Sequence, residues 1–455
     1  MNCGMFSKIK FKVSEIAVVS IAFIAGVLLT LRIKESPKTH NLETSDTKMR
    51  SQSTDNLTTD LHSGKNRPEK RNGSPDQLMT PEISLPMIPE GIEDLIGNTP
   101  LFKIKSLSEA TGCMILAKAE FLNGAGGSPK DRVALNMIRT AEEQGLLKPG
   151  RGDTIYEGTV GSTGISLASL ARALGYNAHI CMPNDQSQEK LESLLFLGAQ
   201  VERVMPAPIT SPEHYVNLAR RRAMEHNEAG SESKGYFADQ FENKANFKAH
   251  FSSTGPEIWK QTGGKIDAFV AGAGTGGTLS GVALYLKQKM NLGEKILVVL
   301  ADPDGSGLYN KVKHGVMFSN TEREGTRRRH QVDTIVEGIG INRLTDNFEA
   351  GMEFIDDSVK VNDLQAMKMA RWLVEKDGSS SAVNCVAAVV TALKMPKESR
   401  IVTVLCDSGN RHLSKFWKKI AELEPGEEHQ GTELLEMLGI FDKIKRKEVS
   451  GETLT

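Results

Sequence analysis

The chain has 455 residues, of which 39% are hydrophobic and 25% are charged, and its 56 basic and 57 acidic residues leave a formal net charge of −1. This composition is typical of a soluble globular protein, so it excludes wholesale disorder and a multi-span membrane protein. The balanced charge gives no indication of nucleic acid or of an acidic partner. The length predicts about two to four structural units.

The cysteines are few, odd in number and widely scattered. No CxxC pair occurs, so the sequence predicts neither a disulfide framework nor a zinc knuckle, and we expect no metal. A reducing compartment is expected for the folded core. The five positions are Cys3, Cys113, Cys181, Cys385 and Cys406.

The first 34 residues are predicted to be a membrane anchor. Residues 16–31 carry no charge, and lysines precede the run while Arg32 and Lys34 follow it. Sixteen helical residues span about 24 Å, and Val13 and Ser14 extend the expected helix to about 13–32. A secretory signal peptide is the alternative, but no small-residue cleavage site follows. The segment resembles signal anchors of the mitochondrial outer membrane.

Residues 35–88 are predicted to be a disordered polar tether. The stretch holds no Phe, Trp or Tyr and is rich in Ser, Thr, Asn, Asp, Lys and Pro. It cannot bury enough apolar surface to offset the loss of chain entropy on folding.

Residues 89–424 alternate between strand-like and helix-like segments. Apolar β-branched runs that alternate with segments of period 3.6 predict β-α-β units and parallel sheets covered by helices on both faces. A polar tail, 425–455, follows with one short amphipathic helix near 433–446. The predicted strands are 114–119, 153–157, 178–182, 266–271, 296–301 and 401–405, and the predicted helices are 130–144, 163–174, 278–290, 364–375 and 382–393.

A glycine-rich loop over 272–278, between a strand and a helix, predicts a phosphate ligand. Glycines let backbone N–H groups approach a phosphate closely, and the amino end of a helix favours an anion. The loop also satisfies G-x-G-x-x-G, and Asp302 ends the next strand, so a dinucleotide site is an alternative. A tight turn without any ligand is the other alternative.

A second loop, 123–132, places a lysine at the start of a helix. Ser128 is the expected N-cap, Pro129 the first helical residue and Asp131 a favourable acid in the first turn. Lys130 lies at the positive end of the helix beside Arg132, which favours its neutral amine. A neutral amine is the form that a Schiff-base nucleophile needs.

A third loop, 157–164, also joins a strand to a helix. Its hydroxyls and backbone amides are predicted to form a pocket for a carboxylate. The alternative is simple capping of the helix by Ser162 or Thr163.

These motifs together resemble one family. Gly-Gly-Ser-Pro-Lys-Asp-Arg at 126–132, the loops at 159–164 and 274–278 and Asp-Ser-Gly at 407–409 occur in the order and spacing of the cysteine synthase (O-acetylserine sulfhydrylase)/cystathionine β-synthase family. Segments 96–101, 240–243 and 254–259 match as well. The resemblance implies a two-domain tryptophan-synthase-β-like fold (fold-type II), with the small domain inserted at about 130–245. Combined with the anchor, it resembles the fungal membrane-anchored mitochondrial cysteine synthases.

The resemblance implies pyridoxal 5′-phosphate as cofactor and assigns roles to residues. Lys130 would bond the cofactor covalently and act as acid and base at the substrate Cα, and Ser408 would meet the pyridine nitrogen. The family loop usually reads Thr-Ser-Gly-Asn-Thr-Gly, so Val160 and Ser162 depart from it, and Ser162 replaces the asparagine that meets the cofactor 3′-oxygen. The phosphate would be held by Gly274, Thr275, Gly276, Gly277 and Thr278, and the substrate carboxylate by Thr159, Thr163 and Gln240.

The expected reaction is therefore formation of L-cysteine and acetate from O-acetyl-L-serine and sulfide, by a homodimer anchored in the mitochondrial outer membrane. Cystathionine β-synthase activity, serine or threonine dehydratase activity, a nicotinamide oxidoreductase and a non-catalytic scaffold are the alternatives. About thirty residues follow the core, which are too few for the paired regulatory domains of cystathionine β-synthases.

Overall fold

The computed structural model describes residues 88–317, 334–379, 382–423 and 434–439, all within one compact unit, Ser84–Thr455. The expected anchor and the expected tether up to residue 87 lie outside the described residues. Within the described ranges, no helix combines the length and the hydrophobicity that crossing a membrane requires.

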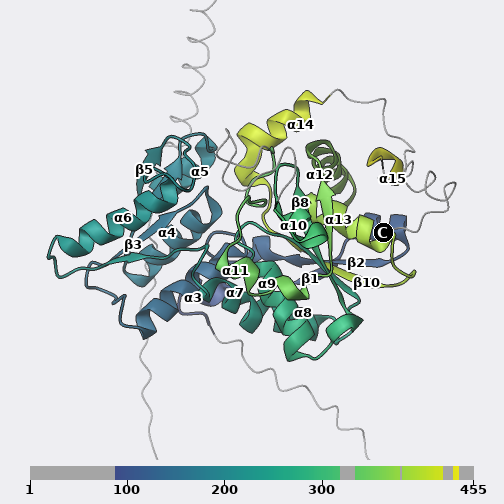
Figure 1. Ribbon diagram of the computed structural model, residues 1–455, viewed down its shortest axis with the longest axis horizontal. Coiled ribbons are helices and arrows are strands. Elements are labelled where there is room, and N and C mark those ends of the chain that lie inside the picture. Colours follow the sequence, from purple (N-terminus) through teal and green to yellow (C-terminus); the bar gives the residue numbers. More distant parts are fainter. Residues whose placement is uncertain (1–87, 318–333, 380–381, 424–433, 440–455) are drawn as a thin grey trace, which may run out of the picture. The chain divides into compact units, whose positions relative to one another are not determined.

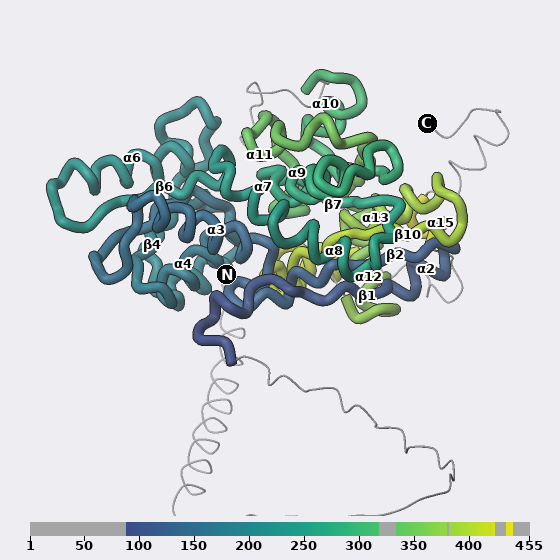
Figure 2. Tube along the Cα trace, turned by 90° about the horizontal axis from the view of Figure 1, so that it is seen from below, coloured from purple at the N-terminus to yellow at the C-terminus, as the bar shows by residue number. Residues whose placement is uncertain are grey.

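A six-stranded sheet forms one lobe of the unit. Its order is β1-β2-β10-β7-β8-β9, and every neighbouring pair is parallel except the antiparallel β1–β2 pair at the edge. Figure 2 shows β2 beside β10, although almost three hundred residues separate them. The strands are β1 (Leu101–Lys103), β2 (Met114–Ala119), β7 (Ala268–Gly272), β8 (Leu297–Pro303), β9 (Asp357–Val361) and β10 (Arg400–Leu405).

Helices cover both faces of this sheet (Figure 1). Ala268 and Val270 of β7 pack with α2 (Lys105–Thr111), α12 (Asp363–Asp377) and α13 (Val383–Ala392). Phe269 and Ala271 of the same strand pack on the opposite side with α8 (Gly255–Gln261) and α9 (Gly277–Ala283). Successive side chains of β7 therefore pack into two separate cores on opposite faces of the sheet, as expected for a parallel strand that is buried on both faces.

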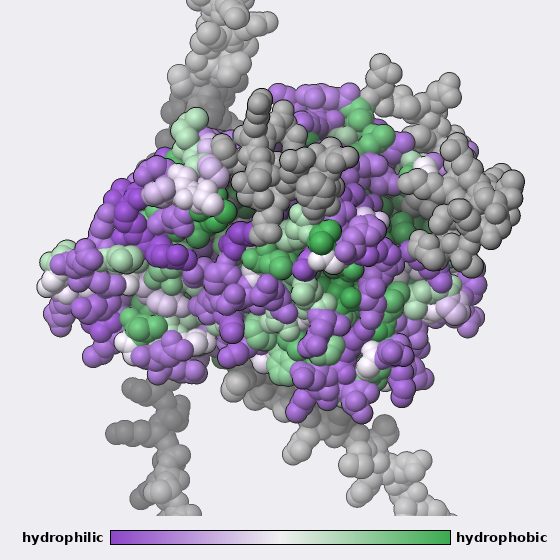
Figure 3. All heavy atoms as spheres, viewed as in Figure 1, coloured by the Kyte–Doolittle hydropathy of each residue, from purple (hydrophilic) through white to green (hydrophobic). Residues whose placement is uncertain are grey.

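A four-stranded parallel sheet forms the second lobe, in the order β5-β4-β3-β6. Its core packs one face against α3 (Lys130–Glu143), α4 (Ser162–Leu174) and α5 (Gln188–Phe196), and α6 (Tyr215–Glu228) covers the other. The face in Figure 3 is mostly hydrophilic on both lobes, as the outer surfaces of such helices require. The strands are β3 (Thr154–Gly158), β4 (Asn177–Pro183), β5 (Gln200–Val204) and β6 (Gly235–Phe237).

Short elements complete the described chain. They are α7 (Ala245–Ala249), α10 (Leu308–His314), α11 (Asp346–Glu349), α14 (Lys418–Glu422) and α15 (Leu434–Met437), the π-helical turns η3 (His250–Thr254), η4 (Leu284–Lys289) and η8 (Leu413–Trp417), and the 3₁₀ turns η1 (Ile92–Leu95), η2 (Glu120–Leu122), η5 (Gly293–Lys295), η6 (Met352–Phe354) and η7 (Asn410–His412).

The predicted alternation of strands and helices is confirmed, but the strands β1, β5, β6 and β9 were not predicted, and two of the predicted helices differ. The helix expected over 278–290 changes to π-helical hydrogen bonding at Leu284. Of the helix expected over 433–446, the structure describes residues 434–439, which contain α15 (Leu434–Met437) followed by Gly439 in a left-handed conformation (φ +65°). Leu434 and Met437 of this short helix are buried against the core around α12 and α13, and residues 440–455 lie outside the described chain.

Candidate active site

Four of the predicted site segments follow the carboxyl end of a strand, which is where open parallel sheets bind ligands. Residues 159–161 follow β3, Gln240 follows β6, 273–276 follow β7 and Ser408 follows β10. Lys130 differs, because it is the first residue of α3.

The loop before Lys130 is fixed by the side chain of Asp131. Its carboxylate accepts hydrogen bonds from Gly126 N at 2.7 Å, Gly127 N at 2.8 Å and Ser166 Oγ at 2.5 Å. The predicted N-cap at Ser128 is wrong: Pro129 is the cap, and Ser128 Oγ is buried without a hydrogen-bond partner among the described residues. Proline has no side-chain acceptor, so Asp131 stabilises the turn from inside the helix.

Lys130 is held in a form that favours the neutral amine. Burial lowers the pKa of Lys130, and none of the hydrogen bonds in the described part of the chain involves its amine. The predicted cause, the charge of Arg132, is not the main one. Arg132 is neutralised by Glu120 (Nε–Oε2 2.8 Å) and Glu257 (Nη1–Oε1 2.6 Å). Removal from water therefore makes the Lys130 amine a potential nucleophile and base.

The glycine loop after β7 presents a row of backbone donors. None of the hydrogen bonds among the described residues is donated by the N–H groups of 274–278. Gly276 has φ +86°, and a Cβ there would lie 2.5 Å from Phe348 Cα. A Cβ on Gly274 would lie 2.3 Å from the carbonyl oxygen of Gly338. Glycine is therefore required at both positions, and the packed backbone leaves five adjacent N–H groups for an anion.

Two polar residues that the sequence analysis missed support this loop. Asn246 Nδ2 donates to Thr275 Oγ1 at 2.9 Å and to the carbonyl oxygen of Gln240 at 2.7 Å. His250 Nε2 lies 3.1 Å from Thr278 Oγ1, and burial holds the pKa of His250 well below its ordinary value. The available signal was their spacing: residues four apart share one helix face.

The loop after β3 and Gln240 form one hydrogen-bonded group. Thr163 Oγ1 donates to Gln240 Oε1 at 2.6 Å, and Gln240 Nε2 donates to the carbonyl oxygen of Gly158 at 3.1 Å. Thr159 Oγ1 accepts from Gly161 N at 3.2 Å. The alternative that Ser162 or Thr163 caps α4 is wrong, because Gly161 is the cap and no side chain caps it.

Glu157, also missed from the sequence, lies under this group. Gln240 donates to its carboxyl through both N (3.2 Å) and Nε2 (3.3 Å). Burial, with Asp239 nearby, raises the pKa of Glu157 to about 8. A largely protonated carboxyl at neutral pH leaves the pocket without a negative charge that would repel a carboxylate ligand.

Ser408 is exposed, and no hydrogen bond among the described residues joins it to the other predicted site residues. Cys406, two residues before it, is close enough to Lys130 to influence the lysine electrostatically. The Ser408 turn is closed by Asp407 Oδ1, which accepts from Gly409 N at 2.8 Å. The structure therefore brings the Ser408 turn near Lys130 while leaving its hydroxyl open to solvent.

A buried charge cluster ties the Ser408 turn to the other lobe. Glu337 pairs with Lys190 of α5, with His412 Nδ1 at 3.2 Å and with Lys415 Nζ at 2.9 Å. His412 Nε2 also lies 3.2 Å from Asp407 Oδ2. The stem of Lys190 covers the loop after β3, since a Cβ on Gly161 would lie 2.6 Å from Lys190 Cδ. The cluster thus connects the Ser408 turn to the loop after β3.

The free energy of unfolding is expected to fall as pH rises through about 9. Burial alone would lower the pKa of His412, but its contacts with Asp407 and Glu337 outweigh burial and the nearby Lys190 and raise it to about 9. The pKa of this histidine in the unfolded chain is about 6.5. The stabilisation that the protonated ring gives to the folded state is therefore complete below pH 6.5 and is lost above pH 9. It amounts to at most about 3 kcal/mol. Urea unfolding at pH 7 and 10 measures it, and an equal drop in His412→Gln would contradict this assignment.

Asp302 does not serve the dinucleotide alternative. Its side chain is fully buried, and Oδ2 accepts from Tyr309 N at 2.7 Å in the first turn of α10. A carboxylate that binds a ribose must be accessible at the surface where the ligand lies. The G-x-G-x-x-G spacing in this chain therefore does not indicate a dinucleotide site.

Comparisons with known proteins agree with this geometry. The family profile described as "Pyridoxal-phosphate dependent enzyme" matches residues 92–407. The chain is 70% identical to "Cysteine synthase 2" of Neurospora crassa over 78% of this chain and 79% of that protein. It is 56% identical to "Putative mitochondrial cysteine synthase" of Saccharomyces cerevisiae over 75% of this chain and 87% of that protein.

A solved structure shows the same fold. The crystal structure of O-ureido-L-serine synthase superposes with a TM-score of 0.61 at 28% identity, covering 75% of this chain and 98% of that one. The family profile reaches from η1 to Asp407, so it includes both sheets and the loops at 123–132, 157–164 and 272–278. The chain belongs to the family of pyridoxal-phosphate-dependent enzymes of fold-type II.

Proposed function

We propose that this chain is a pyridoxal-phosphate-dependent cysteine synthase, which forms L-cysteine and acetate from O-acetyl-L-serine and sulfide. The similarity to proteins named cysteine synthase, at 56 to 70% identity over about three quarters of the chain, carries the proposal. Lys130 is half-buried without an ion-pair partner among the described residues, and burial lowers its pKa. This costly placement supports catalysis over a non-catalytic scaffold.

The residues present fit the cofactor. The free N–H groups of 274–278 suit its phosphate, the Lys130 amine suits its aldehyde, and the exposed Ser408 hydroxyl suits its ring nitrogen. Ser162, at the start of α4, would face the 3′-oxygen in place of the family's asparagine. When bound, pyridoxal phosphate supplies the electron sink that makes the substrate Cα–H bond acidic and the bond to the β-oxygen breakable.

The protein's own groups then handle binding and protons. Thr159, Thr163 and Gln240 bind the substrate carboxylate, with Gln240 oriented by Glu157 and by the Gly158 carbonyl. The Lys130 amine takes the proton from Cα and returns it at the end of the reaction. Ser408 is neutral, so it does not favour protonation of the ring nitrogen as a carboxylate would. This arrangement suits elimination of a good leaving group such as acetate.

A product assay separates the candidate activities. Purified holoenzyme should convert O-acetylserine and sulfide to cysteine and acetate. It should form much less cystathionine from serine and homocysteine, and little pyruvate from serine alone. Cystathionine as the dominant product would support the synthase of that name, and pyruvate would support a dehydratase.

Ser162→Asn is expected to raise turnover with O-acetylserine by about two- to twelvefold. Asparagine reaches further than serine, and one neutral hydrogen bond to the cofactor is worth about 0.5–1.5 kcal/mol if it is expressed fully at the transition state. The cofactor absorbance should shift as well, because the ring is held more firmly. Steady-state rates at saturating sulfide and a visible spectrum measure both.

The double variant Val160→Ser, Ser162→Asn is the control for crowding in this loop. Val160 is half-buried beside Gly161, so asparagine alone could overpack the turn. If both variants fall well below the parent, the loop is adapted to a substrate other than O-acetylserine.

We also propose a single-pass anchor at about 13–32 and a mitochondrial location, in the outer membrane. The uncharged run 16–31 supports the anchor, and the name of the yeast relative supports the mitochondrion. The family resemblance supports a homodimer, which analytical ultracentrifugation of the purified chain tests.

Deleting residues 1–34 should release a soluble, active enzyme. The deletion removes the only long uncharged apolar run of the amino-terminal region and leaves the residues from Ser84 onward intact. Carbonate extraction followed by an activity assay of both fractions measures the effect. A truncated protein that still sediments with membranes would show that the anchor lies elsewhere.

A further inference from the structure

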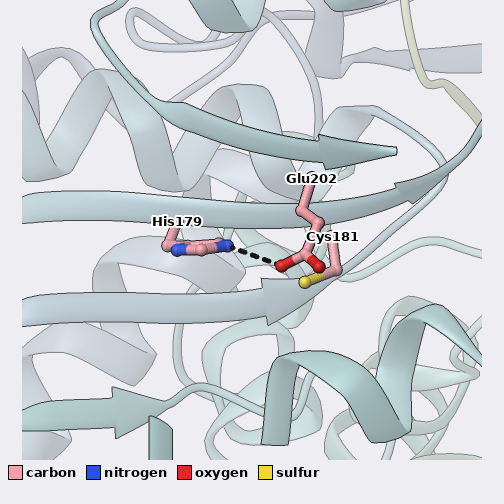
Figure 4. Close-up of side chains that lie close together, drawn as sticks. All are labelled: His179, Cys181 and Glu202. Carbon is pink, nitrogen blue, oxygen red and sulfur yellow. Dashed lines mark ion pairs between the residues drawn. The ribbon is translucent and has the colours of Figure 1, made fainter. Parts of the chain in front are cut away.

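The four-stranded sheet places three metal-ligand residues together, outside the site described above. His179 and Cys181 are two apart on β4 and therefore share one face, and Glu202 of β5 pairs in register with Cys181. The face is the one covered by α6, since Ala178, Ile180 and Met182 pack in the opposite core. Figure 4 shows the three side chains converging.

Their separations approach those of ligands on one metal ion. His179 Nε2 lies 3.4 Å from Glu202 Oε2, and all three ligand atoms lie within 4.8 Å of one another. Two nitrogen or oxygen ligands on a tetrahedral zinc ion are about 3.4 Å apart, and sulfur and nitrogen ligands about 3.6 Å. The separations of the Cys181 sulfur therefore exceed tetrahedral values by at most about 1 Å.

His179 is nine-tenths buried, and its nearest polar neighbour among the described residues is Glu202, 3.4 Å from Nε2. At this separation Nε2 makes no hydrogen bond of good geometry in the described part of the protein. Tyr156 stacks on the ring at 5.0 Å between centroids and fixes its plane.

We propose that His179, Cys181 and Glu202 form a binding site for one zinc-like divalent cation. Nitrogen, sulfur and carboxylate donors together are a typical zinc set. Tyr156, His179, Glu202 and His226 line a surface pocket, which gives an ion a path to the site and room for a water as fourth ligand.

The charges around the site balance. Arg222 donates to both oxygens of Glu202, from Nε at 2.9 Å and from Nη2 at 2.8 Å, and Nη1 donates to Glu225 at 2.8 Å. A carboxylate has about four acceptor positions, so these bonds leave room for a metal. With the Cys181 thiolate, the cation, the two carboxylates and the guanidinium sum to zero. Arg222 therefore acts as an outer partner that orients Glu202.

Binding exchanges a proton for the metal. The Cys181 thiol loses its proton to solvent as the sulfur–metal bond forms, and no oxidant or reductant is involved.

The test measures zinc binding to full-length holoenzyme and does not depend on catalysis. After chelator treatment and gel filtration, the parent should take up one Zn²⁺ per chain at micromolar concentration or below. Cys181→Ser and His179→Gln should each weaken binding by about a hundredfold or more, since even outer-partner changes cost ten- to a hundredfold. His226→Gln, in the same pocket but outside the triad, should bind as the parent does.

Failure of the parent to bind, or unchanged affinity in both ligand variants, would overturn the site. If Cys181→Ser does not fold by circular dichroism, Glu202→Gln replaces it, because Glu202 is partly exposed. Loss of binding in His226→Gln alone would place the ion elsewhere in the pocket and also overturn the proposal. Cysteine synthase activity is assayed separately, so either outcome leaves the proposed function untouched.

Discussion

Lys130→Ala is expected to abolish turnover, by at least about a thousandfold, and to remove the visible absorbance of bound cofactor. The variant loses both the covalent attachment point and the base that acts at Cα, and general acid–base catalysis alone supplies up to about ten-thousandfold. The fold should persist, because the loop before Lys130 is held by Asp131 and not by the lysine itself. Circular dichroism and an absorbance scan measure the two effects together.

Lys244→Ala is the matched control, since Lys244 is exposed and lies just before α7. It should keep full absorbance and rate. Visible absorbance retained in Lys130→Ala would show that another lysine carries the cofactor.

Arg132→Ala is expected to cost about 3–5 kcal/mol of unfolding free energy. Glu120 is fully buried, and Arg132 bonds its two carboxylate oxygens at 2.8 Å each while also bonding Glu257. Removing the guanidinium leaves the Glu120 carboxylate buried without its cation. A buried charge that has lost its partner destabilises the folded state strongly. Lys118 still pairs with Glu257, so most of the cost falls on Glu120.

Arg139→Ala on the same helix is the comparison. Its ion pair with Glu142 is about half exposed at the arginine, and such pairs are worth about 0.2–1 kcal/mol. Urea unfolding of both variants gives the two values. If they were equal, the buried pair would not carry the stability assigned to it here.

The sequence was sufficient for the elements of the fold because burial on both faces leaves a clear pattern. The strand predicted at 114–119 is β2 residue for residue, and the helix predicted at 130–144 is α3 to within one residue. Pairing order was not predictable in this way. That β10 lies between β2 and β7 depends on tertiary contacts across the whole chain. The antiparallel edge strand β1, three residues long, has no periodicity to detect.

The glycine-rich loops of the site, where backbone groups would bind the ligand, could be predicted from the sequence. Contacts between side chains that are far apart in the sequence could not. The glycines at 274 and 276 indicated that other atoms approach the backbone closely there. The structure shows these contacts, which leave no room for a Cβ at either position. Glu157 supports Gln240, which is distant from it in sequence, and nothing local marks this contact. The neutralisation of Arg132 was missed for the same reason, because Glu120 and Glu257 approach it from different segments.

The attachment of pyridoxal phosphate to Lys130 is tested most directly by locating the cofactor on the chain. Borohydride reduction of the holoenzyme makes the bond between lysine and cofactor permanent, and peptide mass spectrometry then identifies the modified lysine. We expect one pyridoxyl group per chain, on the peptide that contains Lys130, in a preparation that makes cysteine from O-acetylserine and sulfide. A label on any other lysine, or an active preparation without a label, would contradict it.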